Sequence, residues 1–405
     1  MRPDNYKEVS SSHRCYLVPS LRLHPLHPLL LQSFLQDIAE SDLEHLQARG
    51  TDLSSVDGKI LARAIMSFVS VDLANTELRD DQLEDIFQNI ASVGHLRLKS
   101  LTLDRNDFSV IPTTDLMSQA LVRLEAVSLW KTRLKFYQLD RLFCEIAESE
   151  SLELRSLDLS FTLISSVTAS LLAKALVRLE AVVLFDTRLD DSAVLSLLTE
   201  ISVSEKLTLR SLDIRYNQLS CVPPQLLSRS LVRLEEVDLW NTLLTSHQLH
   251  SILEAIARST QLNLSKLSLK GLDLSPASSD LLSQAMVRLA QIDLTATKLS
   301  GDQVTSLLNT ILTEDQTSLA VLNLSGNNLS LVEPSLLAGA VVKLREVSLD
   351  QTFITQTQFE EILTTVLDSS SHRLKILALN FNSNTNLASA ERISGARGKL
   401  CSLEL

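Results

Sequence analysis

The stretch LNLSGNNL at residues 322–329 decides the fold of this chain. Apolar and polar residues alternate from Leu322 to Leu324, which predicts a short strand with one buried face. The side chain of Asn327 can hydrogen-bond the backbone where the chain turns away from that strand. The segment therefore predicts a strand that ends in a tight turn.

The same pattern returns along the chain at a nearly constant interval, which is the mark of an internal repeat. Its first leucine is found at Leu46, Leu101, Leu157, Leu212, Leu267, Leu322 and Leu377. A second series lies between these segments and has threonine where asparagine would stand: Thr76, Thr132, Thr187, Thr242, Thr297 and Thr352. Two units therefore alternate, a shorter one from Leu101 to Val127 and a longer one from Val127 to Leu157.

A helical pattern follows each predicted strand. Leu139, Leu142, Phe143 and Ile146 stand at i, i+3, i+4 and i+7 and form one apolar helix face. A single strand and helix cannot bury their apolar faces alone, so neighbouring units must stack. We expect a right-handed β-α superhelix, shaped like a horseshoe, with a parallel concave sheet and convex helices.

This pattern resembles leucine-rich repeats of the ribonuclease inhibitor type, and most of all the C-terminal repeat region of NOD-like (NACHT) receptors. Ribonuclease inhibitor itself is less similar, because it is dense in cysteine and this chain has four. The resemblance implies an α/β leucine-rich repeat solenoid. It also implies non-enzymatic protein recognition through the concave face, as the sensing or autoinhibitory region of an innate immune receptor.

Two regions are predicted. Residues 1–40 are expected to form a degenerate repeat or N-terminal cap, because Phe34, Leu35 and Ile38 match a later helix end and prolines interrupt the preceding strand. Residues 41–405 are expected to form the repeat domain. Its last predicted strand is apolar and lacks a polar cap, so we expect a fragment or an incomplete gene model.

Composition excludes several classes of protein. The 405 residues are 45% hydrophobic, 21% charged and 4% aromatic, which is typical of a folded chain with a core. Widely separated cysteines, the lack of a signal peptide and the lack of a long apolar run predict a soluble, cytoplasmic protein without a membrane partner. Nine glycines include no phosphate-binding motif, so no cofactor is expected.

The column directly after the second strand leucine is the first candidate site. It contains both tryptophans, Trp130 and Trp240, and Phe185 between them, on alternate strands about 10 Å apart. Phe161 and Tyr216 take the next position on the intervening strands. Aromatic anchors are typical of protein interfaces, so we predict a partner-binding patch. The alternative is that these rings only fill the concave edge.

The column between the strand leucines is rich in aspartate: Asp72, Asp158, Asp213, Asp238 and Asp293. With a formal net charge of −12, this column should repel nucleic acid and favour a protein partner with a basic surface. Asp158, Asp213 and Asp238 are therefore included in the predicted binding site. The alternative is an ordinary solvated sheet face.

Catalytic and metal sites are not expected. Asp158 and Asp213 could suggest paired carboxylates, but an open sheet offers no cleft around them. His247 and His250 stand at i and i+3 without a third metal ligand. Two other functions remain open: a GTPase-activating protein similar to the Ran activators, although the acidic tail of that family is missing, and a substrate receptor of a ubiquitin ligase, although residues 1–40 do not resemble an adaptor segment.

Overall fold

The computed structural model describes residues 20–22, 32–33, 35–37, 43–111, 113–314, 317–369, 373–382 and 390–405. Within them, 15 strands form one open parallel sheet in which each strand pairs with its neighbours in the chain. The strands are β1 (Ser20–Arg22), β2 (His45–Gln47), β3 (Ser70–Asp72), β4 (Ser100–Thr102), β5 (Ala126–Ser128), β6 (Ser156–Asp158), β7 (Ala181–Val183), β8 (Ser211–Asp213), β9 (Glu236–Asp238), β10 (Lys266–Ser268), β11 (Gln291–Asp293), β12 (Val321–Asn323), β13 (Glu346–Ser348), β14 (Ile376–Ala378) and β15 (Ser402–Glu404).

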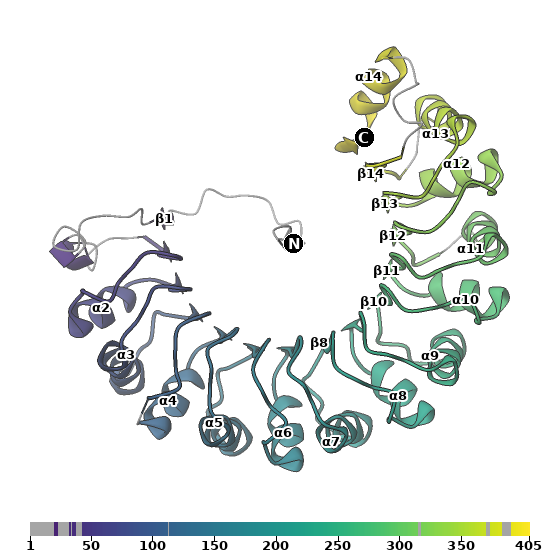
Figure 1. Ribbon diagram of the computed structural model, residues 1–405. Helices are drawn as coiled ribbons and strands as arrows, with labels where there is room; N and C mark the ends of the chain where they lie inside the picture. Colours follow the sequence, from purple (N-terminus) through teal and green to yellow (C-terminus); the bar gives the residue numbers. More distant parts are fainter. Residues whose placement is uncertain are drawn as a thin grey trace.

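A helix follows each strand from β2 to β14 and lies on the convex side of the arc (Figure 1). The helices are α2 (Gly58–Ile65), α3 (Asp80–Ser92), α4 (Thr114–Leu121), α5 (Phe136–Glu148), α6 (Ala169–Leu176), α7 (Asp191–Val203), α8 (Pro224–Leu231), α9 (Ser246–Arg258), α10 (Ser279–Met286), α11 (Gly301–Thr313), α12 (Pro334–Lys343), α13 (Gln356–Asp368) and α14 (Ala390–Lys399). The predicted solenoid is confirmed.

The two kinds of unit differ in the length of their helix. The shorter unit, from Ser156 to Ala181, contains the 8-residue helix α6. The longer unit, from Ala181 to Ser211, contains the 13-residue helix α7. Because the strands keep equal length, the additional residues of the longer unit extend its helix and leave the sheet register unchanged.

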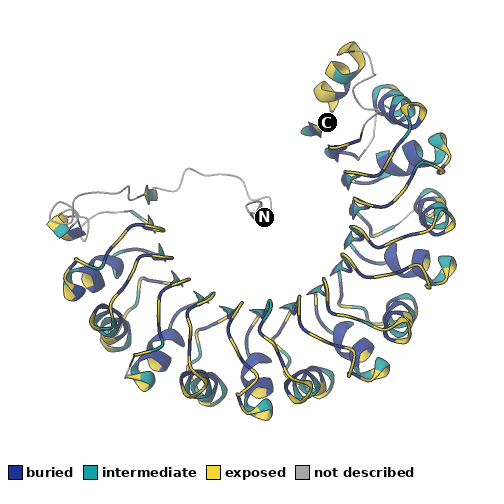
Figure 2. Cartoon of the chain, viewed as in Figure 1, coloured by how far each residue is buried: buried dark blue, intermediate teal, exposed yellow. Residues whose placement is uncertain are grey.

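The core lies between the sheet and the helices, where Figure 2 shows the buried residues. Leu157 at the centre of β6 and Leu159 just after it are both fully buried, and Leu172 of α6 packs into the same core. The residue between the two leucines faces the concave side, since successive strand residues point to opposite faces. The alternation in the sequence therefore separates the core from the concave surface.

Basic side chains tie neighbouring units together at the C-terminal ends of helices. The guanidinium group of Arg178 donates to the carbonyl oxygens of Ile146, Ala147 and Ser149, at the end of α5 in the preceding long unit. Equivalent contacts are made by Arg123, Arg233, Arg288, Lys343 and Lys399. A cation at this place satisfies carbonyl groups that the helix leaves unpaired.

The asparagines of the pattern tie the turns together inside the core. The Asn217 amide donates to the carbonyl oxygens of Leu184 and Ile214 at 2.7 and 3.2 Å, and its oxygen accepts from the amide of Leu189. The predicted side-chain bond to the backbone is thus confirmed. Thr162 takes this position in an earlier unit, and its buried hydroxyl lacks a hydrogen-bond partner among the described residues.

The N-terminal region contributes one strand to the sheet. Although prolines were expected to interrupt it, β1 pairs in parallel with β2, with Leu21 opposite Leu46. Leu35 is buried against the core, whereas Phe34 and Ile38 of the predicted helix end lie outside the described residues. The assignment of residues 1–40 as a cap stays a prediction. None of the helices in the described ranges combines the length and the apolar character of a membrane span.

Candidate functional site

A backbone turn follows each strand from β2 to β14 at the edge of the concave surface, and side chains on these turns lie along the sheet. Phe161 and Tyr216 each stand two residues after the second buried apolar residue of the strand pattern, and both have a left-handed backbone with φ of 58°. This conformation turns the chain away from the sheet, and the two rings lie against rings of the neighbouring units. The amide of Phe161 then donates to the carbonyl oxygen of Phe185 at 2.8 Å.

The five predicted aromatic residues form one continuous row across β5 to β9. Adjacent ring centroids are 5.8, 4.8, 5.1 and 5.0 Å apart along the series Trp130, Phe161, Phe185, Tyr216 and Trp240. All four contacts are edge-to-face, a favoured geometry for aromatic pairs. We call these five residues the aromatic row. The sequence placed Phe161 and Tyr216 on the strands between the other three residues, and in the structure their rings bridge both gaps.

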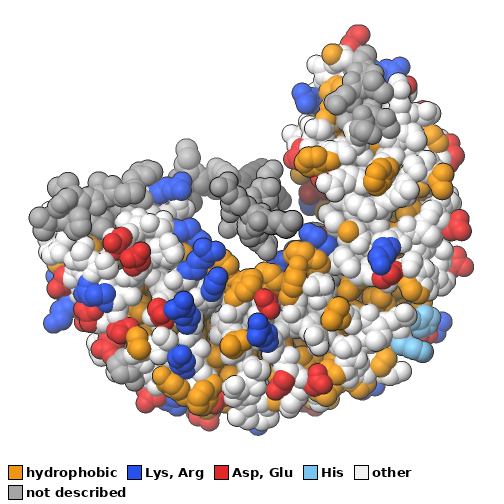
Figure 3. Space-filling model, viewed as in Figure 1, with side chains coloured by type: hydrophobic (Ala, Val, Ile, Leu, Met, Phe, Trp, Pro, Cys, Tyr) orange, Lys and Arg blue, Asp and Glu red, His pale blue; other side chains and the backbone are white. Residues whose placement is uncertain are grey.

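The rings of the aromatic row are partly exposed to solvent. Phe161 and Tyr216 each keep 39% of their surface exposed, while Trp130, Phe185 and Trp240 are half-buried. Hydrophobic side chains gather on the inner side of the arc, next to basic side chains (Figure 3). A partner could therefore touch ring faces and edges without any rearrangement of the sheet.

Cations lie over three rings of the row. The guanidinium carbon of Arg105 is 4.4 Å from the ring centroid of Trp130, and the ammonium nitrogen of Lys270 is 4.3 Å from that of Trp240. Arg215 lies over Phe185 at 4.9 Å. Arg215 and Lys270 occupy the same position in their units as the tryptophans do in theirs, directly after the second apolar residue of the strand pattern. The repeat pattern could therefore have identified them. Their contact with the rings could not be read from the pattern.

The predicted acidic column runs beside the aromatic row and makes bonds within the sheet. The Asp213 carboxylate pairs with Arg215 at 2.6 Å, and Asp238 faces the same guanidinium group at 3.5 Å. Asp158 accepts hydrogen bonds from the backbone amide and hydroxyl of Ser160. These carboxylates thus already have partners of their own, which reduces the negative field they present to a ligand.

Burial changes the acidity of this column. It raises the pKa of Asp238 to about 6, against the attraction of Arg215. It also raises the pKa of Asp158, and the nearby charges of Asp104 and Asp213 act in the same direction. A carboxyl group that is costly to ionise is a weak attractor for a basic partner.

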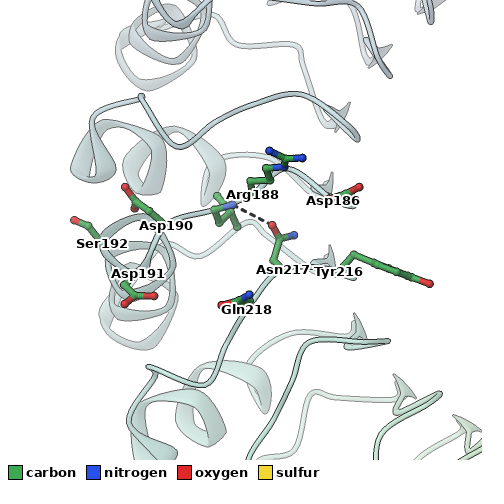
Figure 4. A pocket seen from close by; sticks show the side chains of 9 residues that line it. Asp186, Arg188, Asp190, Asp191, Ser192, Tyr216, Asn217 and Gln218 are labelled. Carbon is green, nitrogen blue, oxygen red and sulfur yellow. Dashed lines mark hydrogen bonds between the residues drawn. The ribbon is translucent and has the colours of Figure 1, made fainter.

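A depression of about 740 Å³ opens at the rim of the sheet, between the turns after β7 and β8 (Figure 4). Asp190 and Asp191 lie at the start of α7, and the Tyr216 side chain points away from them toward the concave face. The Asp190 carboxylate accepts from the amide of Ala193, so it caps the helix. The depression is open to solvent and lacks the enclosure of a small-molecule site.

The residues considered for catalysis or metal binding are not assembled into such a site. Asp158 and Asp213 stand on β6 and β8, with Val183 of β7 between them. His247 and His250 are exposed at the start of α9. Across the part of the chain that the structure describes, no three His, Cys, Asp or Glu residues are grouped to hold a metal ion.

Comparison with known proteins identifies the repeats. The family model described as Leucine Rich Repeat matches residues 208–230 and 318–340, which contain β8 and β12. No curated protein matches the sequence. Two segments thus match this repeat model, and the parallel sheet with its alternating helices has the architecture of a leucine-rich repeat solenoid.

Two solved structures are similar to this one at low identity. The leucine-rich repeat-containing protein LegL7 from Legionella pneumophila is 16% identical, with a TM-score of 0.41, over 95% of this chain and 99% of that chain. A chain in the yeast Rad7 and Elc1 complex is also 16% identical, with a TM-score of 0.44, over 76% of this chain and 70% of that chain. At these values the likeness gives no information about a partner.

Proposed function

We propose that this protein binds a partner protein through its concave face, with the aromatic row as the anchor. The observation that carries the proposal is the continuity of the row: five rings that follow five consecutive strands form an unbroken series of ring contacts on the concave surface. Large rings offer contact area with few rotatable bonds to immobilise, which is why they dominate protein interfaces. Leucine-rich repeat proteins are in general non-enzymatic binding scaffolds, and the proposed role is likewise binding without catalysis.

The charge of the partner is a separate question. The basic partner predicted from the acidic column has limited support, because Asp72 pairs with Arg49 at 2.8 Å and both Asp213 and Asp238 face Arg215. The proposal therefore rests on the rings. Binding of nucleic acid is not part of it, since the rings contact one another edge to face and present no open stacking platform.

A more specific role is proposed from the resemblance of the repeats alone. It is that of the sensing or autoinhibitory region of a cytoplasmic NOD-like receptor, and a nucleotide-binding domain upstream in the same transcript would support it. The alternative role as a GTPase-activating protein has no specific support in the geometry. An assay of GTP hydrolysis by small GTPases, with and without this protein, tests that alternative directly.

The experiment on the concave face uses Phe161→Asn together with Tyr216→Asn. Asparagine tolerates the left-handed backbone at both positions, and Asn75 and Asn241 already adopt it at the same place in other units. The variant therefore removes two exposed rings without adding backbone strain. Trp130→Ala with Trp240→Ala is the second variant, which removes both ends of the row.

The matched control is Phe136→Ala with Tyr137→Ala on α5. These two rings are also exposed and edge to face, at 5.7 Å, but lie outside the row. We expect wild type and control to retain the same proteins from a lysate, measured by quantitative mass spectrometry, and both row variants to lose some of them. If both row variants retain every protein that the wild type retains, the proposal fails. A large fall in melting temperature for the asparagine variant would show that the rings serve packing.

A further inference from the structure

The two ends of the aromatic row carry positive charge. Trp130 at one end lies under Arg105, and Trp240 at the other lies under Lys270, with centroid distances of 4.4 and 4.3 Å. Arg105 lies on the turn after β4, and Lys270 follows β10, so the cations stand one strand beyond each terminal tryptophan. The row is thus an apolar strip with a cation at each end.

The carboxylate nearest to Arg105 along the chain is largely buried. Asp104 is the acidic group next to Arg105 along the chain, and its side chain is only 9% exposed. It accepts from the hydroxyl of Ser128 and the amide of Trp130, and burial raises its pKa. Asp186 follows β7 at the middle of the row, two strands away from either tryptophan. A ligand therefore meets the exposed Arg105 at one end of the row. At the other end it meets Lys270, while the nearby Asp238 carboxylate already faces Arg215 at 3.5 Å.

A third cation extends the basic end at Trp130. Lys131 follows the tryptophan directly, has a left-handed backbone with φ of 57° and is exposed to solvent. Arg133 is also exposed, but it forms an ion pair with Asp107 at 3.0 Å. The basic group at this end therefore consists of Arg105 and Lys131, with Arg133 available only where a ligand competes with Asp107.

The spacing sets the size of a ligand. Six strand intervals separate β4 from β10, which corresponds to roughly 29 Å at about 4.8 Å per strand. An extended peptide advances about 3.3 Å per residue, so about nine residues span this distance. The central rings span the four intervals from β5 to β9.

We infer that the aromatic row binds an extended segment of a partner protein with an apolar centre and acidic residues on both sides. The apolar centre would lie against the five rings, and the flanking carboxylates would pair with Arg105 and Lys131 at one end and Lys270 at the other. This inference rests on the proposed function and reverses the charge of the partner predicted from the sequence. Complementary charges at the rim of an apolar strip fix the position of a ligand along it.

The probe is a displayed library of random peptides of about twelve residues, long enough to include the estimated nine. The wild-type chain of 405 residues is used to select peptides from the library, and the Phe161→Asn/Tyr216→Asn variant is used for counter-selection. We expect enriched peptides to hold apolar residues at the centre and Asp or Glu on both sides. A synthetic copy of the most enriched peptide is then titrated by fluorescence anisotropy at low and high salt.

A charge variant isolates the contribution of the two ends. We expect Arg105→Gln with Lys270→Gln to weaken binding of that peptide about tenfold at low salt, and less at high salt, since salt screens exposed charge pairs. The control is Arg155→Gln with Lys298→Gln, which removes the same charge from exposed pairs with Glu180 and Asp273 elsewhere. This control should bind like the wild type.

The outcomes separate the inference from the proposed function. Enrichment of peptides with Lys or Arg beside the apolar centre would overturn the inference and leave the concave face as a binding surface for a basic partner. Equal binding by the charge variant and its control would also overturn it. If no peptide distinguishes wild type from the asparagine variant, the inference fails, and the proposed function is judged by its own experiment with lysate proteins.

Discussion

Tyr216 and Trp240 are joined both by their backbones and by their rings. The amide of Tyr216 donates to the carbonyl oxygen of Trp240 at 3.1 Å, and the two ring centroids are 5.0 Å apart at an interplanar angle of 79°. Phe161 and Phe185 repeat this relationship two strands earlier, at 2.8 Å and 4.8 Å. The left-handed turn that closes each of these units thus also sets the spacing of the aromatic row.

Gly271 is predicted to set the position of the Trp240 indole. A Cβ atom at Gly271 would lie 3.2 Å from Cδ1 and Nε1 of Trp240, and the glycine has a φ of +71°. Gly326 has the same φ, but its nearest neighbour, in Ala296, lies at 3.4 Å. We expect both Gly→Ala variants to lose about 1 kcal/mol of unfolding free energy from backbone strain.

The two glycine variants should differ in fluorescence. In a Trp130→Phe background, where Trp240 is the remaining tryptophan, Gly271→Ala is expected to shift the emission maximum and Gly326→Ala to leave it unchanged. Equal spectra for the two variants would show that the indole does not depend on the close approach of Gly271.

Arg178 is predicted to stabilise the contact between neighbouring units. Arg178→Ala removes three charge-assisted hydrogen bonds to the carbonyl groups at the end of α5, and we expect a loss of about 2 kcal/mol in a guanidinium unfolding experiment. Arg155→Ala is the control, because its ion pair with Glu180 is exposed and should contribute less than about 1 kcal/mol. Similar midpoints for the two variants would contradict the prediction.

Thr162 is predicted to be a position where one substitution stabilises the protein. Thr162→Asn would place an amide where Asn217 stands in a later unit, within reach of the carbonyl oxygens of Leu129 and Leu159. Because the present hydroxyl is buried without a partner among the described residues, we expect a gain of about 1 kcal/mol, measured by chemical denaturation. The reciprocal Asn217→Thr should lose at least as much. A destabilised Thr162→Asn variant would show that the turn after β6 cannot accommodate the amide.

Asp238 is predicted to make stability depend on pH between about 4 and 6. Its pKa in the folded protein is about 6, above the ordinary 3.8, so folding favours the protonated carboxyl group. The resulting stability is present below pH 4 and is lost as the pH rises through 6. Asp238→Asn lacks this titration, so the wild type should lose stability over this pH range while the variant does not. The unfolding free energy of the variant minus that of the wild type should therefore increase by about 1 to 2 kcal/mol. This figure allows for the partial exposure of the carboxylate to solvent.

Asp293→Asn is the control for the pH experiment. Asp293 occupies the same strand position on β11, where it accepts hydrogen bonds from the amide and hydroxyl of Thr295. This variant removes a carboxyl group from the equivalent strand position and so shows how much of any change with pH comes from losing a carboxylate there in general. A constant difference between Asp238→Asn and wild type would show that Asp238 titrates normally.

The repeat pattern alone specifies the solenoid and the membership of each column. A constant repeat interval sets strand beside strand, and the pleat places alternate residues on opposite faces, so Trp130, Phe185 and Trp240 had to share one concave column. Whether a side chain faces the core or the concave surface depends only on its odd or even position in this alternation. For this reason the aromatic positions could be predicted from the sequence.

Which of those side chains touch one another depends on the folded chain. Phe161 and Tyr216 fill the gaps in the row because left-handed turns direct them sideways, and Arg215 neutralises Asp213 because its side chain folds back over the strand. Arg178 reaches the carbonyl groups at the end of α5 in the preceding unit. Such contacts depend on rotamers and on the curvature of the stack, which a one-dimensional repeat does not specify.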